Sequence, residues 1–196
     1  MAADTALRVA QSVQSVRLLS YVPHMKRISL LLVSALLLTS CGSQKLETND
    51  GKVVSCDAIK VKEVNIKGTS LQCLDGKSSV KLESITGPVL INVWGSWCPP
   101  CRQELPYLKA AYRSGKVNIV GIDIDEKTVE AGRKFAIKAG ITWPNLIDPD
   151  GATKGAFGPG VPITWFLNKD GVVTYRHVGA FKSAKQLDEE IAKYLG

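Results

Sequence analysis

The 196-residue sequence lacks an apolar run long enough to cross a bilayer. Its one extended uncharged apolar stretch, residues 28–38, has eleven residues, whereas a membrane-spanning helix needs about 20. Internal repeats and low-complexity segments are also absent, and hydrophobic residues (45%) and charged residues (22%) occur at ordinary globular frequencies. These features exclude a polytopic membrane protein, a collagen-like chain and a disordered chain. The length suits one ordinary domain with an extension.

Histidine is also scarce, and charges of one sign do not cluster along the chain. There are two histidines, and only His177 follows residue 40. The net charge is +7, and residues 1–40 account for +3 of it, which leaves +4 for the remainder. The basic residues are spread along the chain, so the sequence gives little support to nucleic-acid binding, and no nucleic-acid partner is expected.

The short apolar run has the layout of a secretory signal. Lys26 and Arg27 precede it and small residues follow it. The sequence Leu38-Thr39-Ser40-Cys41 resembles the lipobox of bacterial lipoproteins. This resemblance implies that the chain is cut before Cys41 and that the Cys41 thiol carries diacylglycerol. The expected location is therefore extracytoplasmic, lipid-anchored to the bacterial cell membrane; a plain signal peptide with an incidental cysteine is the alternative.

The chain divides into three parts by composition. Residues 1–40 form the expected signal segment, which we expect to begin at Met25, directly before the basic pair; a long, weakly basic leader is the alternative. Residues 41–52 are polar and turn-rich, as in a tether. Residues 53–196 are expected to fold, and their first part, residues 53–78, is expected to be an N-terminal β extension.

Hydrophobic patterning predicts alternating strands and helices. Short strand-like pieces are expected at residues 59–64 and 79–82. Two runs are nearly all apolar, as in strands buried on both faces, namely residues 89–94 and 117–124. Three helices are expected, over about residues 99–114, over about residues 127–139, and from Ser183, where Ser183 and Gln186 fit a capping box. A hairpin is expected from residues 163–167 and 172–177. This order predicts an α/β sandwich with a mixed sheet.

The chemistry is expected at Trp97-Cys98-Pro99-Pro100-Cys101, between a predicted strand and a predicted helix. A cysteine at a helix start lies near unpaired backbone N–H groups and the positive end of the helix dipole, and both stabilise a thiolate. The thiolate is the nucleophile in disulfide exchange, and cysteines in such motifs have pKa values of about 3.5 to 7. We therefore expect an exposed Cys98 to attack and Cys101 to resolve the mixed disulfide. Pro99 and Pro100 suit a first helical turn, where a missing N–H costs nothing.

The residues around this motif resemble the thioredoxin superfamily, and more closely its membrane-tethered TlpA/ResA-like thiol-disulfide oxidoreductases. The resemblance covers roughly residues 75–196 and rests on residues 92–106 and on Gly160-Val161-Pro162-Ile163-Thr164. It implies a thioredoxin-like three-layer sandwich whose mixed central sheet is flanked by helices. It also implies a cis peptide bond before Pro162 that faces the cysteine pair, with Val161 offering backbone groups to a bound peptide. The expected substrate-binding residues are Trp97, Pro99, Pro100, Val161 and Pro162.

One position departs from cytoplasmic thioredoxins, in which a buried aspartate stands where this chain has Asn92. A proton acceptor must then come from elsewhere. TlpA/ResA-like proteins carry an acidic residue just after the next strand, which maps onto Glu126. We expect Glu126 to be the general acid/base that adjusts Cys101. The alternative is a solvated carboxylate at a helix start, where acidic residues are favoured.

Cys56 and Cys73 remain, 17 positions apart in the N-terminal extension. We expect them to form a structural disulfide, in a compartment where disulfides persist. Closing a loop of that size contributes about 3 kcal/mol in the chain-entropy model. Their spacing does not match the paired motifs of a four-cysteine zinc site, and neither a metal nor another cofactor is expected. Packing or surface roles are expected for His177, and core positions for Trp143, Trp165, Phe157 and Phe181.

The sequence thus predicts a monomeric, lipid-anchored extracytoplasmic thiol-disulfide oxidoreductase. The resemblance implies a reductant of protein disulfides in c-type cytochrome assembly, with apocytochrome or an assembly factor as substrate and a membrane thiol-transfer protein as its own reductant. Proteins of this fold span about −270 to −120 mV, so an oxidative folding catalyst is the alternative. A peroxidase fits the paired cysteines less well. A non-enzymatic copper carrier of the Sco type is a further alternative, although that family has three residues between its cysteines and a distant histidine ligand.

Overall fold

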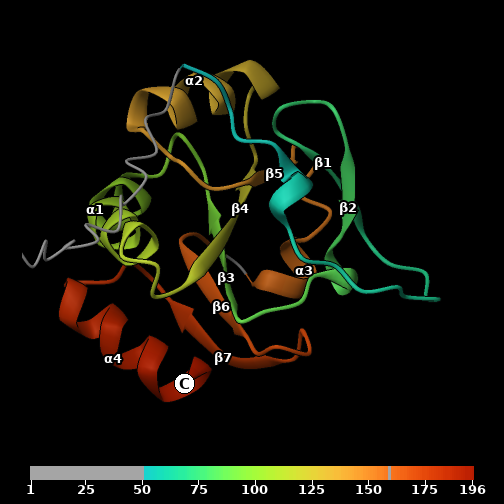
Figure 1. Ribbon diagram of the computed structural model, residues 1–196. Coiled ribbons are helices and arrows are strands. Elements are labelled where there is room, and N and C mark those ends of the chain that lie inside the picture. The colour runs from blue at the N-terminus through green and yellow to red at the C-terminus, as the bar shows by residue number, and fades with distance from the viewer. Residues whose placement is uncertain (1–50, 159) are drawn as a thin grey trace, which may run out of the picture. The chain divides into compact units, whose positions relative to one another are not determined.

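The two nearly all-apolar runs lie side by side at the centre of a sheet in the computed structural model, which describes residues 51–158 and 160–196 (Figure 1). β3 (Val89–Trp94) is buried along its whole length, and β4 (Asn118–Ile124) is buried from its second residue onward. The two strands pair in parallel, from Val89 opposite Asn118 to Trp94 opposite Asp123. The helix α1 (Pro99–Arg113) connects them, which gives the predicted β-α-β unit.

Five further strands extend the sheet to the order β2-β1-β5-β4-β3-β6-β7. β5 (Asn145–Asp148) pairs in parallel with β4. On the other side, β6 (Ile163–Leu167) and β7 (Val173–Val178) form the predicted hairpin, and β6 runs antiparallel to β3. A second hairpin, β1 (Ser70–Cys73) and β2 (Ser79–Lys81), lies along the outer edge of β5. The predicted α/β fold with a mixed central sheet is confirmed.

Side chains of β3 alternate between the two faces of the sheet, so each face carries a hydrophobic core, and helices cover both cores. Leu90 and Trp94 pack into one core with residues of α1, α2 (Val129–Ala139) and α4 (Ala184–Leu195). The other core lies under the short helices, which are η1 (Cys56–Ala58), η2 (Leu82–Ser84) and α3 (Lys154–Phe157). Ser183 caps α4 as predicted, since its hydroxyl oxygen accepts the Gln186 N–H at 3.1 Å.

The structure corrects the strand expected at residues 59–64 and adds detail to the core. Residues 59–64 form no strand, and the only pairing there is an isolated bridge from Val61 to Ile85. The buried residues of α2 are Gly132 and Ala136, and position 132 needs glycine because a Cβ there would lie 1.8 Å from an Asp123 side-chain oxygen on β4. Of the four aromatic residues expected in the core, three are buried and Trp165 is half-buried.

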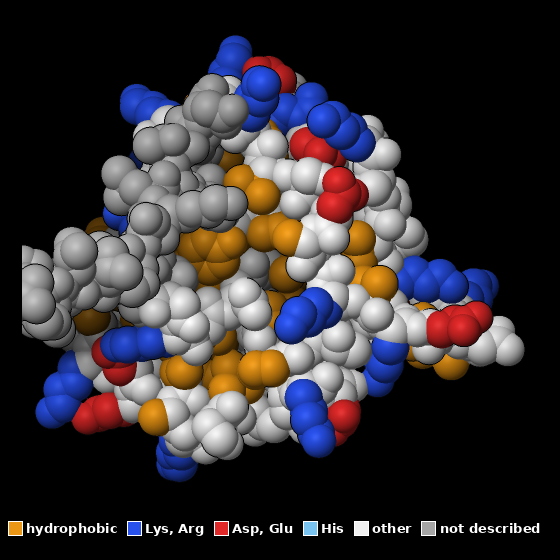
Figure 2. All heavy atoms as spheres, viewed as in Figure 1, with side chains coloured by type: hydrophobic (Ala, Val, Ile, Leu, Met, Phe, Trp, Pro, Cys, Tyr) orange, Lys and Arg blue, Asp and Glu red, His pale blue; other side chains and the backbone are white. Residues whose placement is uncertain are grey.

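The expected signal segment, Cys41 and most of the tether lie outside the described residues. In the part of the chain that the structure does describe, no helix has both the length and the apolar character needed to span a membrane. On the face shown in Figure 2, Lys and Arg side chains are scattered around a hydrophobic centre and do not gather into one patch.

Candidate active site

Cys98 lies at the junction of β3 and α1. β3 ends at Trp94, a three-residue loop follows, and Cys98 caps the first turn of α1. The Cys98 sulfur accepts the backbone N–H of Cys101 at 3.2 Å, and Pro99 and Pro100 occupy the first two helical positions. The Cys101 N–H and the helix dipole both favour negative charge at this end, so the position stabilises a Cys98 thiolate once the pair is reduced.

Cys98 and Cys101 form a disulfide whose sulfurs are both covered by the protein. Cys98 is 1% exposed and Cys101 is 6% exposed, so the expectation of an exposed Cys98 was wrong. The exposed group is the neighbouring Trp97, at 49%, whose indole N–H donates to the Ile124 carbonyl at 3.2 Å. Gly95 permits this fold of the loop, because a Cβ there would lie 2.6 Å from the Trp97 indole nitrogen.

The loop before β6 faces this disulfide. The Val161–Pro162 peptide bond is cis, and the Val161 carbonyl oxygen lies 3.8 Å from the Cys98 sulfur. Trp97 and Val161 line a groove of about 500 Å³, together with Ile124, Asp125, Lys154, Gly155, Gly158 and Gly160. Pro99 and Pro100 are exposed, Val161 is half-buried and Pro162 is buried. The apolar side chains and glycines of this groove suit an extended peptide, and Asp125 and Lys154 add an ion pair at 2.9 Å. The substrate-binding role of Trp97, Pro99, Pro100, Val161 and Pro162 stays a prediction.

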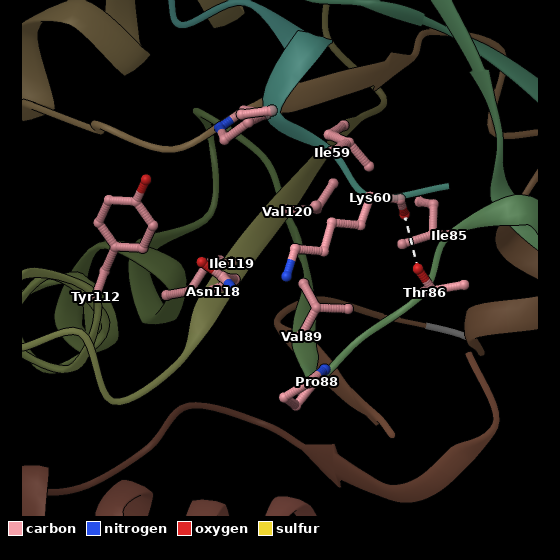
Figure 3. A pocket seen from close by; sticks show the side chains of 12 residues that line it. Ile59, Lys60, Ile85, Thr86, Pro88, Val89, Tyr112, Asn118, Ile119 and Val120 are labelled. Carbon is pink, nitrogen blue, oxygen red and sulfur yellow. Dashed lines mark hydrogen bonds between the residues drawn. The ribbon is translucent and has the colours of Figure 1, made fainter. Parts of the chain in front are cut away.

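A second pocket lies at the opposite end of the central strands, between the N-terminal extension and the starts of β3 and β4 (Figure 3). Lys60, Val89, Tyr112 and Asn118 are among its lining residues. Its volume of about 70 Å³ has room for only a few water molecules. This pocket is therefore too small for a peptide. The groove lined by Trp97 and Val161 is the candidate substrate site because it adjoins the cysteine pair.

Glu104 of α1 is a buried carboxyl to which the sequence alone assigned no role. Its side chain is 0% exposed, one turn after Cys101. One carboxylate oxygen accepts from the Asn92 amide at 2.9 Å and the other accepts the Phe181 N–H at 3.1 Å. Burial raises the pKa of Glu104 to about 7, although both hydrogen bonds oppose the rise. The spacing of Cys101, Glu104 and Leu108 along one helix face was the available signal.

Glu126 lies against the loop that presents Cys98. Ser96 donates its backbone N–H and its hydroxyl to the two Glu126 oxygens, the hydroxyl at 2.8 Å. On the other side, Arg102 of α1 donates to the Ser96 carbonyl oxygen at 3.1 Å. Glu126 is 9% exposed and precedes α2, whose N-cap is Thr128, so it is a buried group beside the motif and not a solvated one. Its role as the acid or base for Cys101 stays a prediction.

The remaining cysteines of the described chain are also joined. Cys56 in η1 and Cys73 at the end of β1 form a disulfide across 17 positions, and both side chains are buried. The bond ties the start of the N-terminal extension to its hairpin. Its contribution to stability stays a prediction.

His177 has structural contacts on β7. Its ring stacks on Phe181 with centroids 4.1 Å apart, and its Nδ1 lies 3.0 Å from a Glu190 carboxylate oxygen. Across residues 51–158 and 160–196, no group of three or more His, Cys, Asp or Glu side chains is placed to hold a metal ion.

Comparisons with known proteins match this architecture. The Redoxin family model matches residues 45–194. A thiol-disulfide oxidoreductase ResA of Bacillus cereus is 30% identical over 178 residues, which are 87% of this chain and 97% of that protein. ResA of Bacillus thuringiensis (strain Al Hakam) is 33% identical over 127 residues, or 62% of this chain and 69% of that protein.

Solved structures of related oxidoreductases share this fold. A thiol:disulfide interchange protein DsbE from Chlorobium tepidum superimposes with a TM-score of 0.56 and 31% identity, over 66% of this chain and 94% of that chain. A secreted Mycobacterium tuberculosis disulfide oxidoreductase superimposes with a TM-score of 0.53 and 27% identity, over 64% and 95%. The chain therefore belongs to the Redoxin family and, within the thioredoxin superfamily, to the TlpA/ResA-like thiol-disulfide oxidoreductases.

Proposed function

We propose that the protein is a lipid-anchored extracytoplasmic reductant of protein disulfides that serves c-type cytochrome maturation. The observation that carries the proposal is the Cys98 and Cys101 pair at the start of α1, beside a groove that suits an extended peptide. The lipobox-like sequence ending at Cys41 supports the anchor. The likeness to ResA proteins supports the choice of an exchange reaction.

The proposed reaction moves two electrons to the substrate. The Cys98 thiolate attacks one sulfur of the substrate disulfide, so that a mixed disulfide forms and the first substrate sulfur leaves as a thiolate, which takes up a proton. Cys101 then loses its proton to a base and attacks the Cys98 sulfur, and the second substrate sulfur leaves. The substrate ends as a dithiol and the protein as the Cys98–Cys101 disulfide, which a membrane thiol-transfer protein must reduce.

The proton of Cys101 needs an acceptor, and we assign this role to Glu126. Support comes from its burial beside the loop that presents Cys98. Alkylation rates of both thiols should be measured against pH in wild type, Glu126→Gln and Glu104→Gln. If Glu126→Gln leaves both pH profiles unchanged, Glu126 is not the acid/base. A changed profile in Glu104→Gln alone would transfer the role to Glu104.

The substrate and the direction of electron flow can be tested together. Cys101→Ser cannot resolve the mixed disulfide, so partners should accumulate on Cys98, and a Cys98→Ser control should trap none. A reduction potential near the lower end of the range from about −270 to −120 mV supports a reductant, and one near the upper end supports an oxidative folding catalyst. Mass analysis of the mature protein tests the anchor, because an unmodified N-terminus at any other residue than Cys41 excludes it.

A further inference from the structure

Asp123 is a buried carboxyl that the proposed reaction does not use. It lies near the end of β4, opposite Trp94 of β3 and Ile147 of β5, and its side chain is 0% exposed. Gly132 of α2 lies against it, since a Cβ on Gly132 would come within 1.8 Å of one Asp123 oxygen. The sheet and α2 therefore enclose this carboxyl completely.

No described hydrogen-bond donor reaches either Asp123 oxygen. The facing group is a second carboxyl, Glu126, because a Cβ on Gly132 would lie 1.8 Å from an Asp123 oxygen and 3.5 Å from the Glu126 Cγ, so the two side chains meet beside Gly132. Two carboxyls can form a hydrogen bond only when one of them carries a proton. The strands and α2 place three uncharged residues around Asp123, namely Trp94, Ile147 and Gly132. Glu126 is therefore the charged group that faces Asp123. Burial, followed by the charge of Glu126, raises the pKa of Asp123 to about 9.

Glu126 connects this carboxyl to the reactive loop. Its two oxygens accept the N–H and the hydroxyl of Ser96, and Arg102 holds the Ser96 carbonyl oxygen from the other side. Ser96 stands two residues before Cys98. A protonated Asp123 can donate to an ionised Glu126 that still accepts both Ser96 donors. An ionised Asp123 would instead repel Glu126 and weaken its hold on Ser96.

We propose that Asp123 is a positioning residue of the exchange reaction, which keeps its proton at neutral pH, donates one hydrogen bond to Glu126 and so holds the loop that presents Cys98. The inference rests on the proposed exchange at Cys98, and it holds for either direction of electron flow.

The first test uses the oxidised full-length protein, in which neither cysteine of the pair can titrate. At pH 8, above the pKa of Glu104 and below that of Asp123, the infrared spectrum should show one protonated carboxyl band. The band should be lost in Asp123→Asn and kept in Asp188→Asn, which changes an exposed carboxylate on α4. A wild-type spectrum without the band at pH 8, or a band that persists in Asp123→Asn, overturns the proposal.

The second test measures the rate at which reduced protein exchanges with a small disulfide. Wild type should lose rate above about pH 9, whereas Asp123→Asn should keep its rate, because an amide N–H donates to Glu126 at every pH. Asp123→Ala removes the donor and should lower the rate at pH 7 by about tenfold. Equal pH profiles for wild type and Asp123→Asn contradict the positioning role. Absence of exchange in wild type would instead defeat the proposed function and leave the infrared result standing.

Discussion

Replacing Glu104 with glutamine should change how the stability of the protein depends on pH. Burial raises the pKa of Glu104 from 4.5 to about 7. The folded protein therefore binds this proton more tightly than the unfolded chain does. The resulting stabilisation is complete below pH 4.5 and is lost as the pH rises through about 7. The shift corresponds to about 3 kcal/mol, at about 1.4 kcal/mol per pKa unit. Glutamine stays neutral and avoids this loss.

The assay is urea unfolding of the oxidised protein at pH 4.5 and pH 8, which bracket the titration. The free energy of unfolding of Glu104→Gln, relative to wild type, should rise by about 3 kcal/mol between the two pH values. Asp123 and the other groups that titrate in both proteins contribute equally to both free energies, so their contributions cancel in this difference. The control is Glu189→Gln, an exposed position on α4, which should show no such rise. A relative stability that changes by less than about 1 kcal/mol would refute the reasoning.

Three further outcomes are expected. Replacing Cys56 and Cys73 together with serine should lower the free energy of unfolding by about 3 kcal/mol, measured with the Cys98 disulfide intact, because an unfolded chain without the 17-residue link gains entropy; a loss below about 1 kcal/mol would contradict the chain-entropy account. Ser183→Ala should cost about 1 kcal/mol in the same assay, since it removes the cap of α4, and an unchanged midpoint would show that the cap is dispensable. Trp97→Ala should lower kcat/KM by about tenfold for a protein disulfide and leave a small disulfide unaffected, and equal losses for both would exclude a docking role.

The elements with strong periodicity could be predicted from the sequence. β3 is an apolar run interrupted only by Asn92, and the helix after it starts with two prolines, so both were found within a residue of their ends. β5 was missed because it has only four residues and begins and ends with polar side chains, Asn145 and Asp148, which are typical of a loop. Its burial comes from strands on both sides, which no local pattern records.

The redox motif could be predicted from the sequence, and its surroundings could not. Cys98 and Cys101 are recognisable by their spacing, whereas the coverage of Cys98 depends on Val161, which is 63 positions away. Glu104 and Asp123 were assigned no role because charged residues are usually exposed. Their burial follows from tertiary packing, of Phe181 and Asn92 around the first and of Gly132 against the second.

The hairpin of β1 and β2 has a consequence for self-association. β5 is buried at all four residues, and β1 occupies the edge along which another strand could otherwise add. The Cys56–Cys73 bond fastens β1 to η1, and the sheet ends at β2, a strand of only three residues. If reduction of this bond allowed the β1–β2 hairpin to separate from β5, the edge of β5 would be exposed. A strand from a second copy of the protein could then pair with that edge. A cross-link on the periphery of the fold would then keep neighbouring molecules from polymerising.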